Sequence, residues 1–357
     1  MGEAHASEKG PSRAHVTIKD VARAAMVSVT TASMVLNSRP TALPIGEEAR
    51  QRILVASAEL GYLPNLFAQR LRTGRSRTLG VMVTTITDPI TDEVVHAVDV
   101  VARERGYHTL LTLSGMGLST AGQPTAGESI ADRFVDGMLV CGFQLVGYAP
   151  FPGVAQRHRG SITAIANIAG LPSFSVDVDI RRGVSMALRH LHELGHRRLG
   201  LIYDSRHEAM RDRWAAFNDF VQEAGLPRVP GYIQATEAGY YEGGQLATAQ
   251  ILALPTPPTA ILAANDQMAL GAIHAAWRRG VHVPDELSVV GFDDVAMAGY
   301  MVPSLTTVRQ PIAEMGRRAT EVLIDLLERR GDPLQVADRL LQPELVIRDS
   351  TAPPSTP

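Results

Sequence analysis

The chain has 357 residues, 45% of them hydrophobic and 20% charged, which suits two or three globular domains, and its single cysteine, Cys141, excludes a disulfide framework or a multi-cysteine metal site. No apolar run reaches the ~18 residues that span a bilayer, and the polar N-terminal segment does not have the form of a signal peptide, so we expect a cytoplasmic protein without membrane contact. The net charge of −3 hides an asymmetry, because residues 1–80 carry eleven Lys and Arg against six Asp and Glu; a basic head on an acidic body favours a polyanionic partner.

The N-terminal region is predicted to begin with a disordered tail, residues 1–15, which are rich in Gly, Ser, Pro and charge. A first helix is predicted after Thr17, a good N-cap with Asp20 three positions on, close to a capping box. Ser28 is the N-cap of a second helix that runs to Asn37. Only about two residues separate these helices, so they have to cross, as they do in a helix-turn-helix unit.

A third helix is predicted from about Glu47 to Leu60, and Gly61 suits its C-terminal end. Asn65 can cap a short helix over residues 66–72, and residues 73–77 have the composition of a flexible basic linker. The short helix is too short to be stable alone, so its ordering on a partner is a natural switch point. The resulting assignment is a helix-turn-helix domain at 16–62 and a hinge helix with its linker at 63–78.

Beyond residue 78, continuous apolar strands alternate with helices, which predicts parallel sheets covered on both faces. The strands are too many for one small lobe, so we expect two lobes with a ligand cleft at the carboxyl ends of their strands. A helix near 311–328 is expected to return to the first lobe, and a last strand near 345–347 to complete the second. The predicted bounds are 79–350 for this domain, with 79–175 and 309–335 in lobe 1, 176–306 and 338–350 in lobe 2, and a disordered Pro/Ser/Thr-rich tail at 351–357.

Several segments, in order and at close to family spacing, resemble the LacI/GalR family of bacterial repressors from about residue 16 to 348. In the head they are 17–22, 25–28, 31–33 and 35–37, followed by the hinge-like 61–65. In the body they are 135–137, 190–198, 264–266, 288–294, 305–308 and 310–311.

The resemblance implies an all-α helix-turn-helix head and an α/β two-lobed, periplasmic-binding-protein-like sensor domain. It further implies a repressor that binds a pseudo-palindrome in double-stranded operator DNA as a homodimer, under the control of a small-molecule effector such as a sugar or a related metabolite. Neither an enzymatic activity nor a cofactor is implied. The C-terminal tail has no heptad repeat, which argues against a tetramer zipper and leaves a dimer.

The resemblance also implies DNA contacts. Base-reading positions hold Val29, Thr30 and Met34, which can offer a hydroxyl or an apolar contact to a base edge. Leu71 resembles a leucine that enters the minor groove together with its dimer mate. The alternative is that the Ser and Thr residues only cap helices and that Leu71 packs on the next lobe. The remaining candidates for contacts to the phosphate backbone and near the hinge are Thr17, Thr31, Ser33, Asn37, Tyr62 and Asn65.

Effector-binding positions of the family match four residues of the body, each next to a strand end or inside a helix. An Arg fork beside Asp and Asn suits vicinal hydroxyls or a carboxylate. The alternatives are helix caps and a structural ion pair. Near the cleft rim, the frequent Asn-Pro-Phe-Phe is replaced by Asp-Pro-Ile-Thr, so aromatic stacking is lost there, and either Tyr240 or Tyr241 could replace it. The candidate effector-binding residues are Thr84, Asp88, Asp179, Arg213, Asn265 and Asp293.

Two positions of the head depart from the family pattern. Met26 stands at a frequent turn glycine, where a left-handed backbone would be strained, and Gly46 stands where a Ser cap is expected. Two other classes of protein share features with this sequence. A solute-binding protein without a DNA-regulatory role shares the two-lobed body, whereas an enzyme is disfavoured by the lack of a phosphate loop, a metal-ligand cluster or a nucleophile elbow.

Overall fold

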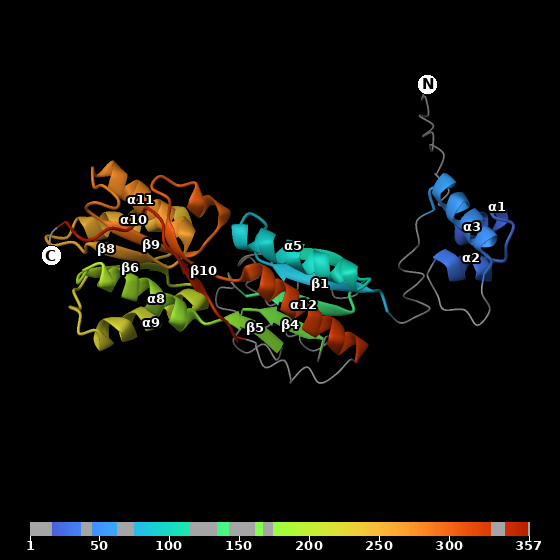
Figure 1. The fold of residues 1–357 in the computed structure, drawn as a ribbon, viewed down its shortest axis with the longest axis horizontal. Helices are drawn as coiled ribbons and strands as arrows, with labels where there is room; N and C mark the ends of the chain where they lie inside the picture. Colours follow the sequence, from blue (N-terminus) through green and yellow to red (C-terminus); the bar gives the residue numbers. More distant parts are fainter. Residues whose placement is uncertain are drawn as a thin grey trace, which may run out of the picture. The chain divides into compact units, whose positions relative to one another are not determined.

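The computed structural model describes residues 16–36, 45–62, 75–113, 134–142, 161–166, 174–329 and 340–355. The chain divides into two compact units, residues 1–76 and 77–357 (Figure 1). The predicted N-terminal tail, Asn37 and the hinge residues Asn65 and Leu71 lie outside the described residues. In the part that is described, no helix combines the length and the apolar character needed to cross a bilayer.

The first unit holds α1 (Ile18–Ala24), α2 (Val29–Leu36) and α3 (Glu47–Glu59). The two predicted N-terminal caps are found: the backbone N–H and hydroxyl of Thr17 donate to the Asp20 carboxylate (3.0 and 2.7 Å), and the backbone N–H of Thr31 donates to Ser28 Oγ (3.0 Å). These caps fix where α1 and α2 begin, so their apolar faces meet α3. The buried core they form consists of Val21, Ala22, Ala25, Ala32, Val35, Ile53 and Ala56.

The turn between α1 and α2 forces a left-handed backbone on a side-chain-bearing residue. Met26 has φ +54° and its side chain is 80% exposed, so it gains little from burial in return for this conformation. A non-glycine residue in this region loses roughly 1–2 kcal/mol to contact between Cβ and the backbone. The strain anticipated from the sequence is therefore present.

Met26→Gly is expected to stabilise the head by about 1 kcal/mol, because relief of the left-handed strain outweighs the greater chain entropy of unfolded glycine. Amide hydrogen exchange of α1 and α2 in the full-length protein measures the change. Met26→Ala is the matched control: it removes the exposed side chain but keeps Cβ, and should give no such gain. Equal protection in both variants would contradict the strain argument.

The second unit contains, within its described residues, two six-stranded sheets. The first has the order β11-β5-β4-β3-β1-β2 and all its strand pairs are parallel. Helix α5 (Pro89–Glu104) packs on β1 and β2, and α12 (Ile312–Glu328) lies beside α5 on β3, β4 and β5 (Figure 1). The strands are β1 (Thr78–Val83), β2 (His108–Leu113), β3 (Gly137–Cys141), β4 (Ile162–Ile165), β5 (Phe174–Val178) and β11 (Leu340–Leu341).

The second sheet has the order β12-β10-β9-β8-β6-β7, parallel except for the β10–β12 pair. One apolar core joins it to α8 (Ile180–Glu193) and α9 (Glu208–Glu223), and another joins it to α10 (Tyr240–Leu252), α11 (Asp266–Arg278) and η1 (Ala296–Gly299). Two parallel sheets covered by helices confirm the predicted fold class. The strands are β6 (Leu199–Asp204), β7 (Ile233–Thr236), β8 (Ala260–Ala263), β9 (Ser288–Asp293), β10 (Thr306–Arg309) and β12 (Glu344–Val346).

The boundary between the lobes differs from the predicted one. Strand β5 was expected to open the second lobe, but it pairs with β4, and the segment at 340–341, also expected there, forms β11 on the other edge of β5. The chain therefore changes lobe after Val178, after Arg309 and between Leu341 and Glu344. An apolar strand can be recognised from its own sequence, but the strand with which it pairs cannot. The local pattern therefore could not assign β5 or β11 to a sheet.

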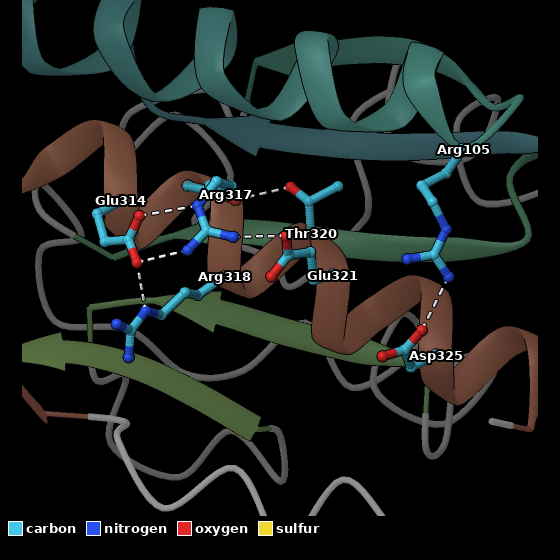
Figure 2. A network of polar contacts seen from close by, with 8 residues as sticks. Arg105, Glu314, Arg317, Arg318, Thr320, Glu321 and Asp325 are labelled. Atoms are coloured by element: carbon cyan, nitrogen blue, oxygen red, sulfur yellow. Dashed lines mark hydrogen bonds and ion pairs between the residues drawn. The ribbon is translucent and has the colours of Figure 1, made fainter. Parts of the chain in front are cut away.

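Polar side chains along α12 bond to one another and to Arg105, which follows α5 (Figure 2). Glu314 accepts hydrogen bonds from Arg317 (2.6 and 2.8 Å) and from Arg318 (2.5 Å), and its contact with Arg317 lowers its pKa to about 2. At the other end of α12, Arg105, which follows α5, donates to Asp325 at 2.9 Å. These groups are partly exposed, so each pair adds little free energy; the Glu314 bonds lie within α12, and it is Arg105 that links the end of α5 to α12.

The C-terminal tail was expected to be disordered, but residues 351–355 lie on the second lobe. His190 Nε2 and Thr351 Oγ1 are 3.0 Å apart, His196 Nε2 donates to the Ala352 carbonyl at 2.9 Å, and the Ala352 N–H donates to Ser288 Oγ at 3.1 Å. The composition predicted disorder because the segment has few apolar residues. The segment is held instead by hydrogen bonds to polar side chains of the second lobe.

His196 makes this attachment sensitive to pH. Its side chain is 1% exposed, and burial lowers its pKa below 6.5, so the folded chain holds it neutral with Nδ1 beside Thr259 Oγ1 (2.8 Å). Below about pH 6.5 the unfolded chain takes up a proton that the folded chain resists, so stability falls as the pH drops.

His196→Gln should therefore lower the stability at pH 7.5, because the hydrogen bonds of His196 are lost. The additional loss of stability between pH 7.5 and pH 5.5 should be smaller in this variant than in the unaltered protein, because glutamine does not titrate. Urea midpoints at both pH values measure the effect, and the exposed His96→Gln serves as the control. If the stability of the His196 variant fell as much between pH 7.5 and pH 5.5 as that of the unaltered protein, His196 would not be the cause of the pH dependence.

Candidate functional site

The outward face of α2 carries the predicted base-reading side chains. Ala32 and Val35 are buried against α1 and α3, which directs Thr30 and Met34, one turn apart, to the opposite side. Thr30 is exposed, Met34 is half-buried, and Val29 at the start of the helix is 43% exposed. These three side chains are therefore available to a partner that approaches the outer face of α2.

The predicted phosphate-contact hydroxyls have structural roles in the unbound chain. Thr17 Oγ1 donates to Asp20, and the Thr31 and Ser28 hydroxyl oxygens are 2.7 Å apart. Tyr62 packs against the head core, and its burial raises its pKa. The alternative role of these hydroxyls, helix capping, is thus present in the structure, and their contacts to DNA stay a prediction. Ser33 is half-buried on the flank of the same face.

A cavity of about 250 Å³ opens between the two lobes of the second unit. Its walls follow the carboxyl ends of strands in both sheets, the location where open α/β folds bind ligands. Asp88 is its acidic residue from the first lobe; it also caps α5 by accepting from the backbone N–H of Ile90 at 2.8 Å. The lining residues are Thr85, Thr87, Asp88, Arg206, His207, Gly239, Tyr240 and Gln267.

One wall is built on a buried acid–base cluster. Asp204 is fully buried at the end of β6 and accepts from Arg206 Nε at 2.9 Å and from its NH2 group at 2.5 Å. His207 lies with Nε2 3.4 Å from the Tyr240 hydroxyl, while its buried Nδ1 has no partner in the part of the chain that the structure describes. Burial lowers the pKa of His207, so near pH 7 the imidazole is neutral and can donate or accept a hydrogen bond.

Tyr240, and not Tyr241, lines the cavity. Burial, followed by the negative charges of Asp88, Asp293 and Asp204, raises the pKa of Tyr240, so its hydroxyl stays protonated. Tyr241 is 51% exposed, and its hydroxyl accepts a hydrogen bond from Gln267 at 3.0 Å. The aromatic wall that the first lobe lacks is thus supplied by the start of α10.

A second buried pair lies behind the cavity. Arg213 and Asp293 are 4% and 8% exposed, with NH2 3.5 Å from Oδ1, and the guanidinium carbon lies 4.1 Å from the centre of the Phe292 ring. Gln310 donates to Asp293 Oδ1 at 2.6 Å. Burial raises the pKa of Asp293, and Arg213 opposes the rise. Among the described groups, Arg213 Nε and Gln310 Oε1 are buried without partners, so polar bonding capacity remains here.

The other predicted effector residues are placed differently. Asp179 accepts from the backbone N–H of Arg182 (2.9 Å) as the cap of α8, and Asn265 accepts from that of Met268 (2.8 Å) as the cap of α11. Thr84 follows β1 but is not among the cavity-lining residues, where Thr85 and Thr87 stand. Sequence reasoning missed these two threonines, Arg206, His207 and Gln267. For Thr85, Thr87, Arg206 and His207 a signal was available, since they are polar residues within four positions of a strand end, whereas Gln267 lies inside α11.

Comparison with known proteins supports the same division of the chain. Residues 17–65 match the model for bacterial regulatory proteins of the lacI family, and residues 188–351 match a periplasmic binding protein-like domain. The repressor CytR of Escherichia coli K12 is 32% identical over 339 residues, which cover 94% of this chain and 96% of CytR.

The chain belongs to the lacI family.

A second relative from the lacI family is the repressor PurR of Haemophilus influenzae strain PittEE, 31% identical over 94% of this chain and 98% of PurR. Solved structures of lacI-family proteins agree. The lac repressor dimer bound to operator and the anti-inducer ONPF is 25% identical with a TM-score of 0.78, and the CelR–cellobiose complex is 26% identical with a TM-score of 0.68; each match covers 94% of this chain and 99% of the other. The predicted family is confirmed, and the chain is a DNA-binding transcription regulator and not an enzyme.

Proposed function

We propose that this lacI-family regulator is a cytoplasmic homodimeric repressor that binds a pseudo-palindromic operator through its head. A small metabolite in the cavity between the lobes governs the affinity. The observation that carries the proposal is one cavity lined by both lobes, in a chain that also has a capped helix-turn-helix unit. A ligand that touches both lobes stabilises one arrangement of them and so shifts the population of DNA-binding states.

A neutral, hydroxyl-rich ligand suits this cavity. Arg206 is neutralised by Asp204, and Arg213 by Asp293, so the cavity offers little uncompensated positive charge to attract an anion. The Asp88 carboxylate, the threonine hydroxyls and the His207 ring offer hydrogen bonds, while Tyr240 supplies an apolar face. A volume of about 250 Å³ suits a monosaccharide-sized compound. CelR, a structural neighbour, is described in complex with cellobiose, which supports a sugar or related metabolite as the class.

In the proposed complex Val29, Thr30 and Met34 of α2 face the bases of the major groove. Hydroxyl and amide side chains around the head contact the phosphates, and Leu71 enters the minor groove beside its dimer mate. The side chains proposed to contact the phosphates or to form the hinge are Thr17, Thr31, Ser33, Asn37, Tyr62 and Asn65.

The route from cavity to head is proposed to run through the segments where the chain changes lobe. Gln310 lies in one of them and donates directly to Asp293, so a ligand that engages the Arg213–Asp293 pair acts on a crossover segment. Two lobes joined by short crossovers can close like a hinge. In the proposed mechanism, closure changes how the first lobes of the dimer meet, and this alters the ordering of the two hinge segments on DNA.

The test is a mobility shift of the purified full-length protein with DNA from upstream of its own gene, against random duplex, at two salt concentrations. Specific binding should persist at the higher salt concentration, because contacts to bases contribute to the affinity in addition to the contacts to phosphates, which weaken as salt increases. A thermal-shift screen of monosaccharides and nucleosides identifies the effector, since a ligand of the folded state raises the melting temperature. Ligand-induced stabilisation without preference for any duplex would favour the second candidate, a solute-binding protein.

A further inference from the structure

The outer face of α2 has an unusual chemical composition for a helix that reads bases. Its side chains are Val29, Thr30, Ser33 and Met34, so this face offers methyl groups, hydroxyls and a thioether. Guanine is read by the paired donors of Arg or Lys, and adenine by the amide of Asn or Gln, whereas the 5-methyl group of thymine is read by apolar contact. Helix α2 (Val29–Leu36) contains none of these charged or amide residues.

The cap of α2 engages two hydroxyls, so the outer face is left with the Thr30 hydroxyl, Ser33 and the apolar groups of Val29 and Met34. Thr31 and Ser28 have their hydroxyl oxygens 2.7 Å apart at the start of the helix, so these groups are engaged in the cap. Met34 is half-buried on the side away from Ala32 and Val35. Its unbranched thioether chain can adapt its shape to a methyl group.

The described cations of the head belong to other elements. Arg23 on α1 donates to Asp20, and Arg52 on α3 donates to Glu48 and to the Ala25 carbonyl. Lys19 is exposed on α1. Charges outside α2 suit the phosphate backbone, which positions a protein without specifying a sequence.

We propose that Met34, together with Val29, reads the 5-methyl groups of thymines in each operator half-site, so that A·T pairs and not guanines are selected under α2. This inference rests on the proposed function, in which α2 enters the major groove. Thr30, in the middle of the same face, offers a hydroxyl to a neighbouring base edge.

The test begins with selection of operators from a random duplex library by the full-length protein. A·T pairs are expected at the positions under α2. In the best selected operator, each thymine is then replaced by uracil, which removes only the 5-methyl group. Loss of one methyl contact should weaken binding roughly fourfold at one or two positions per half-site, from the transfer free energy of a buried methyl.

Three variants make the assignment specific. Met34→Ala should abolish the difference between thymine and uracil at its position, and Met34→Arg should move the preference there to guanine. Arg23→Ala is the control: it should weaken thymine and uracil operators equally and reduce the salt dependence, as loss of a phosphate contact does.

The outcomes separate the inference from the proposal on which it rests. Strong sequence enrichment with uracil tolerated at every position, or with an invariant guanine under α2, overturns the methyl reading and leaves the repressor function intact. A library that shows no enrichment overturns both. Because the thymine-to-uracil comparison uses the unaltered protein, the result does not depend on how well a variant folds.

Discussion

Arg213→Met is expected to lower the free energy of unfolding of the two-lobed unit by about 3–5 kcal/mol, the range for breaking a buried ion pair. The substitution keeps much of the apolar stem against Phe292, but it leaves the Asp293 carboxylate buried with the Gln310 amide as its remaining side-chain donor among the described residues. The same loss should abolish the response of DNA binding to a cavity ligand. Urea unfolding and mobility shifts with the ligand found by thermal screening measure the two effects.

The double variant Arg213→Met with Asp293→Asn separates stability from ligand recognition. Removal of both charges should restore most of the stability, because an uncompensated charge is no longer buried, but it should not restore the ligand response. In the single variant, burial holds the pKa of Asp293 above its usual value, so its carboxyl is protonated as the pH falls and the stability deficit should shrink from pH 7.5 to pH 5. A deficit that is constant with pH would contradict this account.

Gly244→Ala should destabilise the second lobe by about 3 kcal/mol, at the upper end of the usual range for overpacking. A Cβ at Gly244 would lie 2.2 Å from the carbonyl oxygen of Met268. A Cβ at the facing Gly271 would lie equally close to the carbonyl oxygen of Tyr241. Both obstacles are backbone atoms, so the helices α10 and α11 have to separate. Tyr240 begins α10, so the cavity wall moves with the helix.

Gly243→Ala is the matched control, since it adds the same methyl group one position earlier in α10. There the three atoms nearest to the new Cβ all belong to the Thr236 side chain, with Cγ2 at 2.7 Å, so the obstacle is a side chain and not the backbone of a facing helix. Melting temperatures of both variants, with and without the cavity ligand, should show a large loss of stability and of ligand-induced shift for Gly244→Ala alone. Similar behaviour of the two variants would show that the close crossing of the helices is not the cause.

Features that depend on neighbouring residues could be predicted from the sequence, whereas the pairing of strands that are distant in the chain could not. Thr17, Asp20 and Ser28 marked helix starts because a cap is a contact between near neighbours in the chain, and the structure has those contacts. The alternation of apolar strands and helices predicted parallel sheets for the same reason. The sheet that β5 joins depends on β4 and β11, and the latter lies about 160 residues further on, beyond any local pattern.

The candidate site shows the same limit at the scale of single residues. Either Tyr240 or Tyr241 could be expected at the cavity from the sequence, and the choice depends on where α10 begins, which is Tyr240; Gly244 further along α10 serves the crossing with α11. The start of the helix decides which tyrosine faces the cavity. Arg213 and Asp293, 80 residues apart, were singled out through the family resemblance, and they do lie together, whereas the Asp204–Arg206–His207 cluster is local in the chain and could have been noticed at the end of its strand.

The return of the chain between the lobes has a consequence for its synthesis. The first sheet needs α12 and β11, and the second needs β10, β12 and the segment through Ala352 that bonds to Ser288. Neither sheet is complete until nearly the whole chain has left the ribosome. The head, closed within residues 17–59, can fold first, so every nascent regulator passes through an interval in which its DNA-binding helices are formed and its sensor is not.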